Sequence, residues 1–106
     1  MSYAGKVRLI GSVRITNDSA FVPNTNSGAF LSATPALGRA VVALAESARP
    51  SDVFIVSPYG NNVGVLARIV TVDRVSPTQI DIYQFNAAGG IGVTDTAIQW
   101  YRVFDG

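Results

Sequence analysis

Residues 63–85 read VGVLARIVTVDRVSPTQIDIYQF, a stretch that predicts a long β-hairpin. The first arm, residues 63–75, is rich in β-branched side chains and contains no proline, as the interior of a strand requires. A Ser-Pro-Thr turn separates it from the second arm, residues 79–85. In that arm Ile80 and Ile82 share one face and alternate with polar or aromatic side chains, which is typical of a half-buried strand.

The middle of the first arm is apolar on both faces. Val65, Ala67 and Ile69 point to one side of the strand, because successive side chains alternate. Leu66 and Val70 point to the other side. A small domain has one core, which covers one of these faces. We therefore expect the other face to meet another subunit.

The rest of the chain also consists of short apolar runs between turns. Residues 7–15 predict an amphipathic strand, with Val7, Leu9, Val13 and Ile15 on one face. The alternation is broken once in this strand, because the residue at position 10 is a further isoleucine.

Two more apolar runs complete the predicted fold. Residues 53–58 form a continuous run bounded by turn residues, which predicts a fully buried central strand. Residues 97–104 include the only tryptophan and predict a docked terminal strand. Turn-punctuated strands at this spacing indicate an all-β fold, a small β-sandwich or jelly-roll-like barrel of about seven or eight antiparallel strands. We expect one domain over residues 1–106.

Two segments are ambiguous. Residues 20–38 are interrupted by proline, asparagine and glycine, and they predict a long irregular connection with one or two edge strands. Residues 39–48 suit a helix by their alanines, but residues 40–44 also suit a buried strand. We expect a strand over residues 39–45 because the neighbouring segments are predicted strands.

Composition excludes several kinds of chemistry. The chain contains neither cysteine nor histidine, which removes disulfides, thiolate nucleophiles, and the commonest general base and metal ligands. A net charge of +1 provides no electrostatic footprint for nucleic acid. No apolar run has the length of a membrane span or of a secretory leader, so we expect synthesis in a cytoplasm and no membrane partner. We expect no cofactor and no catalysis.

Two carboxylates suggest the most specific catalytic alternative. Asp73 and Asp81 are expected to face each other across the hairpin, as paired carboxylates do in glycosidases. The two carboxylates could instead form structural ion pairs with Arg68, Arg74 or Arg102. Such ion pairs are commoner in proteins than catalytic pairs of carboxylates. A hydrolase is therefore the least favoured of three functional hypotheses.

The order of segments 52–58, 65–70, 79–85 and 98–103 resembles the small β-sandwich modules of tailed bacteriophages. Such modules occur at the tips of tail fibres and spikes and as head-decoration proteins, and they are usually trimeric. Fibre-tip modules normally follow a shaft, whereas the first strand here comes a few residues after Met1. The resemblance therefore implies a structural virion protein, a homotrimeric capsid decoration or accessory subunit that binds other virion proteins and has no catalytic activity.

The predicted subunit interface is the second apolar face of the strands over residues 63–75 and 98–104. Its candidate residues are Leu66, Arg68, Val70, Val72, Ile98, Trp100, Arg102 and Phe104. The two arginines would lose water there, so each should pair with a carboxylate or a carbonyl.

The alternative function is a carbohydrate-binding receptor-recognition module, of the kind found at a tail-fibre or spike tip. Tyr59 could stack on a sugar ring, and Asn61 and Asn62 in the same turn could hydrogen-bond its hydroxyls. The partner would then be a host surface glycan.

Overall fold

The computed structural model describes residues 6–16, 19–58, 68–86 and 95–104. Seven strands and no helix are found in this part of the chain, so the predicted all-β class is confirmed. The strands are β1 (Lys6–Ile15), β2 (Phe30–Ala36), β3 (Arg39–Leu44), β4 (Val53–Pro58), β5 (Arg68–Ser76), β6 (Gln79–Asn86) and β7 (Thr96–Phe104). Within the described ranges no helix is long and apolar enough to span a membrane.

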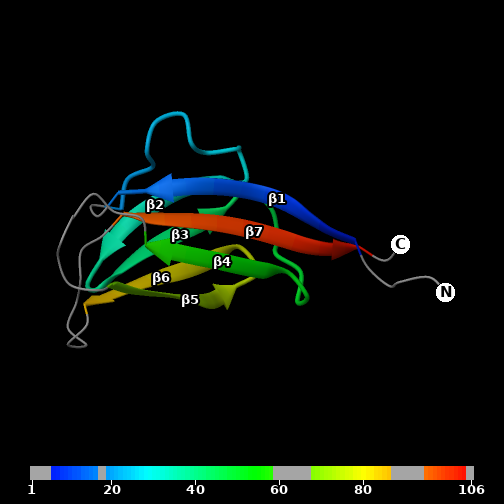
Figure 1. Ribbon diagram of the computed structural model, residues 1–106. Coiled ribbons are helices and arrows are strands. Elements are labelled where there is room, and N and C mark those ends of the chain that lie inside the picture. The colour runs from blue at the N-terminus through cyan, green and yellow to red at the C-terminus, as the bar shows by residue number, and fades with distance from the viewer. Residues whose placement is uncertain (1–5, 17–18, 59–67, 87–94, 105–106) are drawn as a thin grey trace.

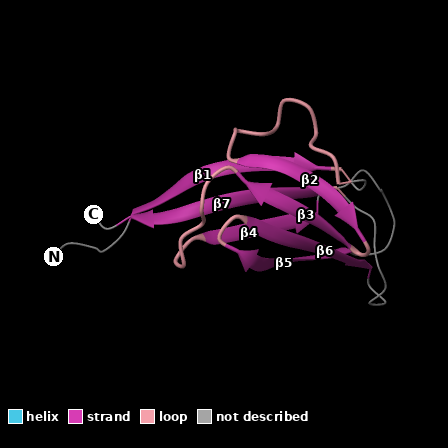
Figure 2. Ribbon diagram, turned by 180° about the vertical axis from the view of Figure 1, so that it is seen from behind, coloured by secondary structure: helices cyan, strands magenta, loops and turns pink. Residues whose placement is uncertain are grey.

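The strands form two antiparallel sheets packed face to face (Figures 1 and 2). One sheet has the order β1-β7-β4 and the other the order β2-β3-β6-β5. This arrangement is a small β-sandwich, as predicted. The core between the sheets consists of Val13, Ile15, Phe30, Ala40, Val42, Leu44, Ala48, Phe54, Ile80, Ile82, Ile98 and Trp100.

The predicted hairpin is confirmed wherever it is described. Strands β5 and β6 pair antiparallel across a short turn at Pro77 and Thr78. Ile80 and Ile82 are both completely buried, as the alternation indicated. The ambiguous segment after Gly38 is also a strand, β3, because its apolar side chains alternate into the same core.

The terminal strand, β7, is the centre of its sheet. It pairs with β1 on one side and with β4 on the other, and it supplies Trp100, whose side chain is completely buried. The Trp100 ring lies 5.3 Å from the ring of Phe54 and 6.1 Å from that of Phe30, which joins the two sheets. Docking of the terminal strand is therefore confirmed.

Residues 53–58 are not the fully buried central strand that their apolar run predicted. Strand β4 is an edge strand of its sheet, and Val53 and Ile55 are each 48% exposed. Only one face of the strand, with Phe54, reaches the core. The prediction was wrong because a short apolar run has the same composition whether one or both of its faces are covered.

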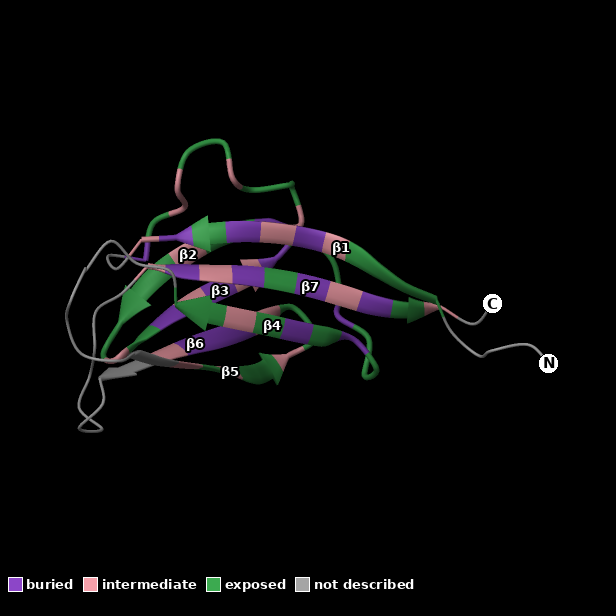
Figure 3. Ribbon diagram, viewed as in Figure 1, coloured by how far each residue is buried: buried purple, intermediate pink, exposed green. Residues whose placement is uncertain are grey.

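Strand β1 also departs from its predicted alternation. A register shift between Leu9 and Gly11 inserts one extra residue. The odd-numbered side chains before this bulge therefore point to the opposite face from the odd-numbered side chains after it. Val13 and Ile15 are buried, whereas Val7 is 64% and Leu9 50% exposed (Figure 3). The expectation that all four share the core face is therefore wrong.

The connection over residues 20–38 contains one edge strand, β2, as expected, and an isolated bridge from Phe21 to Ile15. Before β2 the chain runs along the edge of β1. A Cβ atom at Gly11 would clash with the Cβ of Ala29, so this close approach requires glycine at position 11.

Candidate functional site

The outward-facing side of the β1-β7-β4 sheet is apolar over one of its ends. Because of the bulge in β1, Val7 and Leu9 lie on this side, and alternation along β4 places Val53 and Ile55 there as well. Strand β7 contributes the side chains of Tyr101 and Val103 to this surface. We call this surface the outer face; its residues are Val7, Leu9, Val53, Ile55, Tyr101 and Val103.

Strand register makes the outer face continuous. Val7 lies opposite Val103, and Tyr101 lies between Leu9 on one neighbouring strand and Val53 on the other. Five of the six side chains surround a hollow of ≈ 230 Å³. The Tyr101 hydroxyl donates to Oε1 of Gln99 at 3.3 Å, so the polar end of this ring is turned toward the polar part of the sheet.

The outer face carries no charged side chain. Beyond the bulge the same side of the sheet becomes polar, with Ser12 and Arg14 on β1, Gln99 on β7 and Ser57 on β4. A soluble protein rarely exposes a contiguous apolar patch of several large side chains unless the patch binds something. This surface is therefore the best candidate for an interaction site.

Four of the residues predicted to form the subunit interface lie elsewhere. Ile98 and Trp100 are completely buried in the core, and Val70 and Val72 pack against that core, so these four are not on a free surface. The correction follows from alternation. Successive side chains of a strand point to opposite faces, and these four point into the core from β7 and β5. On β7 the side chains that point outward are those of Tyr101 and Val103.

The other candidates have mixed placements. Leu66 and the side chain of Arg68 lie outside the described part of the structure. Phe104 is half-buried at the end of β7, where its ring is contacted by the guanidinium groups of Arg8 and Arg49 at 4.9 and 5.8 Å. Arg102 is buried within one chain, so its side chain is not exposed on the surface.

Arg102 does have the carboxylate partner that its burial required. Asp52 accepts hydrogen bonds from Nε and Nη2 of Arg102, and its Oδ2 atom also accepts from Nε1 of Trp100 at 2.9 Å and from the amide of Arg49 at 2.8 Å. Burial opposes ionisation of Asp52, but these hydrogen bonds outweigh it and lower the pKa of the carboxyl group. The charge of the Asp52 carboxylate is thus fully compensated.

A second arginine holds the same loop. Arg74 donates from Nη2 to the carbonyl of Arg49 at 2.7 Å and from Nη1 to the carbonyls of Pro50 and Asp52 at 3.2 and 3.1 Å. Nothing in this arrangement leaves a nucleophile or a base free. The cluster therefore fixes the loop between β3 and β4, and we assign it a structural role.

The two carboxylates of the hydrolase hypothesis are directly opposite each other in the β5–β6 register, as expected. Asp81 is buried, accepts from Nε2 of Gln79 at 3.1 Å and pairs with Arg39 at 3.4 Å, while Asp73 is exposed. The expected partners were wrong for Arg74 and Arg102, because both are held by the loop before β4. Among the described residues no group of three acidic side chains could hold a metal ion.

The remaining predicted site lies outside the described residues. This holds for the candidate glycan contacts Tyr59, Asn61 and Asn62, which precede β5. No family model, curated protein or solved structure matches the chain.

Proposed function

We propose that the protein is a structural subunit without catalytic activity, which self-associates through the outer face. The observation that supports this proposal is the exposure of Val7, Leu9, Val53 and Ile55 on one continuous sheet surface. Burial of such side chains contributes roughly 25 cal/mol per Å² of apolar surface removed from water. Association is the simplest way for a chain of this composition to gain that free energy.

A second copy of the chain is the occupant that we favour. In a symmetric assembly of identical chains, equivalent surfaces come close to one another. A charged side chain on such a surface would then meet like charges, which would weaken the association. The outer face has no charged side chain, so no such penalty arises when the outer faces of three copies meet around a threefold axis. We favour a trimer on the resemblance to bacteriophage modules, which also suggests a capsid decoration or accessory subunit of a virion.

The experiment compares two variants that add carboxylates at exposed positions, two on the outer face in one variant and one in a distant turn in the other. Val53→Asp combined with Ile55→Asp places two carboxylates in the outer face, on side chains that point away from the core. Leu37→Asp makes the same kind of change in the turn between β2 and β3, where the side chain is 89% exposed. Light scattering after size-exclusion chromatography should give an oligomer for the wild type and for Leu37→Asp, and a folded monomer for the double variant. An unchanged mass for the double variant would contradict the proposal.

The virion role needs a separate test. Cryo-electron microscopy of the native particle should locate copies of this sandwich on a capsid or tail surface, with their outer faces packed on one another. The receptor-binding alternative would be favoured if glycan arrays gave a signal that Tyr59→Ala abolished. Neither result depends on the other, so the two functions can be distinguished.

A further inference from the structure

The two halves of strand β1 differ in how their free edge is covered. In the half after the bulge, Ser12 donates its amide to Oγ of Ser27 and accepts at its carbonyl from the Ser27 amide, at 2.9 and 3.0 Å. Arg14 likewise donates its amide to Oγ1 of Thr25 and accepts at its carbonyl from the Val22 amide. The segment before β2 therefore satisfies this half of the edge.

No such cover is described for the half before the bulge. Residues 6–10 pair with β7 on one side, and within the described ranges no loop or strand is hydrogen-bonded to their other side. Figure 1 shows this end of β1 extending with the end of β7 beyond the other strands. Alternate residues of an antiparallel strand direct their backbone groups away from the partner, so among the described residues nothing pairs with the outward amides and carbonyls of this half.

The other edges are protected. Strand β2 carries Pro35 and a register shift near Phe30, both of which disfavour pairing with a further strand. Strand β4 ends at Pro58, and the free sides of the two edge strands β4 and β5 lie next to each other (Figure 1). The first half of β1 is thus the edge that remains open among the described strands.

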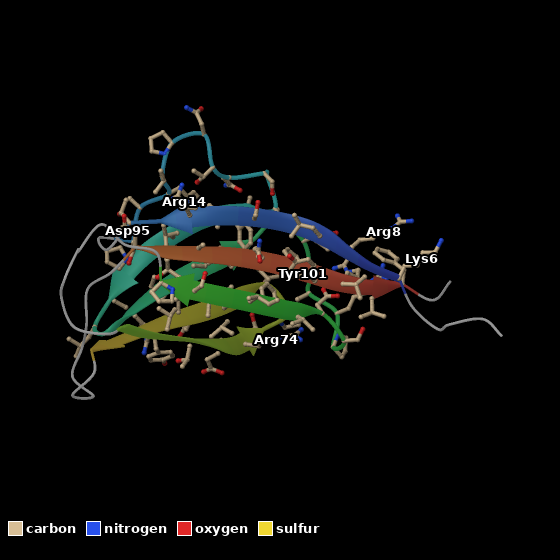
Figure 4. The ribbon with its side chains drawn as sticks, viewed as in Figure 1. Lys6, Arg8, Arg14, Arg74, Asp95 and Tyr101 are labelled. Atoms are coloured by element: carbon tan, nitrogen blue, oxygen red, sulfur yellow. The ribbon has the colours of Figure 1, made fainter. Side chains whose placement is uncertain are left out.

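Side chains on this open edge alternate in a specific way. Val7 and Leu9 belong to the outer face, while alternation places Lys6 and Arg8 on the opposite side. Figure 4 shows both cations at the extended end of β1. Arg49 adds a third cation there, since it shares the ring of Phe104 with Arg8. None of these three cations forms an ion pair with a described carboxylate.

We propose that the open half of β1 binds an extended segment of a partner protein by strand addition, and that this segment alternates acidic and apolar residues. Its backbone would continue the hydrogen-bonded ladder, as in other cases of β-augmentation. Its acidic side chains would lie beside Lys6 and Arg8, and its apolar side chains would extend the outer face beside Val7 and Leu9. A second copy of the same edge is a poor occupant, because it would place lysine and arginine next to one another.

The test uses short acetylated peptides and the full-length protein. A peptide of alternating glutamate and valine should bind, with an affinity that falls as salt is added. A peptide of alternating lysine and valine should not bind. A glutamate–valine peptide that is N-methylated at alternate residues cannot donate to the ladder and should not bind either. Hydrogen exchange should show new protection at the amides of residues 6–10 when the first peptide is present.

Two variants of β1 distinguish an effect of the open edge on peptide binding from an effect of the net charge of the protein. Arg8→Glu should weaken binding by about tenfold, because it replaces an attractive cross-strand pair by a repulsive one. Arg14→Glu makes the same charge change in the covered half and should leave the affinity within about twofold of wild type. Equal loss in both variants, equal binding of the lysine peptide, or binding without protection of residues 6–10 would each overturn the proposal. So would failure of every peptide to bind.

Discussion

Arg102 and Asp52, fifty residues apart in the chain, form a buried bidentate ion pair: Nε lies 3.0 Å from Oδ1 and Nη2 lies 3.0 Å from Oδ2. The pair joins the central strand β7 to the loop that precedes β4. The Arg102 guanidinium also donates to the carbonyl of Ser47 at 3.2 Å, so the loop is held at two points.

Asp52→Asn should lower the free energy of unfolding by about 3–5 kcal/mol, because it leaves the charge of Arg102 buried without its partner. Glu46→Gln is the matched control. Glu46 is also within 3.6 Å of Arg102, but its side chain is 55% exposed, so its loss should cost less than about 1 kcal/mol. Urea unfolding followed by tryptophan fluorescence measures both. Equal effects would contradict the assignment of Asp52 as the principal partner.

The contribution of Asp52 should depend on pH in one direction. Its pKa is lowered in the folded protein from an ordinary value of 3.8, so the unfolded chain takes up the proton first as the pH falls. The stabilisation is therefore complete above this ordinary value and is lost as the pH falls through the lowered pKa of the folded state. The difference in stability between wild type and Asp52→Asn should be constant near neutral pH and should narrow in acid. A difference in stability between these two proteins that stays the same at every pH would contradict this prediction.

Gly11→Ala should destabilise the protein by about 1–3 kcal/mol, because the new methyl group would overlap the side chain of Ala29. Ala29→Gly removes the obstructing atom. The double variant should therefore be more stable than Gly11→Ala alone, which thermal unfolding can measure. No recovery in the double variant would mean that Oγ of Ser27, which would lie 2.9 Å from the new methyl carbon, and not the side chain of Ala29, determines the need for glycine.

Asp73→Asn should leave stability unchanged or raise it by a few tenths of a kcal/mol, since it removes a like charge directly opposite Asp81. Asp81→Asn should instead destabilise, because Asp81 is buried and paired with Arg39. Neither variant should change any hydrolytic activity of the preparation toward polysaccharides. Turnover that both variants abolish would restore the hydrolase hypothesis.

Much of the fold could be predicted from local pattern. The hairpin was evident because Ile80 and Ile82 alternate with polar neighbours, and both prove to be completely buried. The strand after Gly38 could be assigned only from its β neighbours, since its own composition suited a helix equally. The need of Arg102 for a partner was predictable from desolvation, but the choice of Asp52 depends on a loop whose path the sequence does not specify.

The candidate site was harder to predict because it depends on which face of a sheet is covered and on a bulge. Whether one or both faces of residues 53–58 are buried is decided by what packs against their sheet, and the local sequence pattern does not contain that information. The bulge reverses the direction of Val7 and Leu9, and its signals in the sequence were the irregular Ile10 and the glycine that follows it. Both effects expose residues that the pattern placed inside.

The central claim is that the outer face is covered by further copies of the chain. Sedimentation equilibrium of the wild-type protein over a range of micromolar concentrations tests this claim most directly. We predict a mass that is a multiple of 11.2 kDa, three copies on the trimer proposal, and dissociation only on strong dilution. A stable, soluble monomer of 11.2 kDa at every concentration would contradict the account.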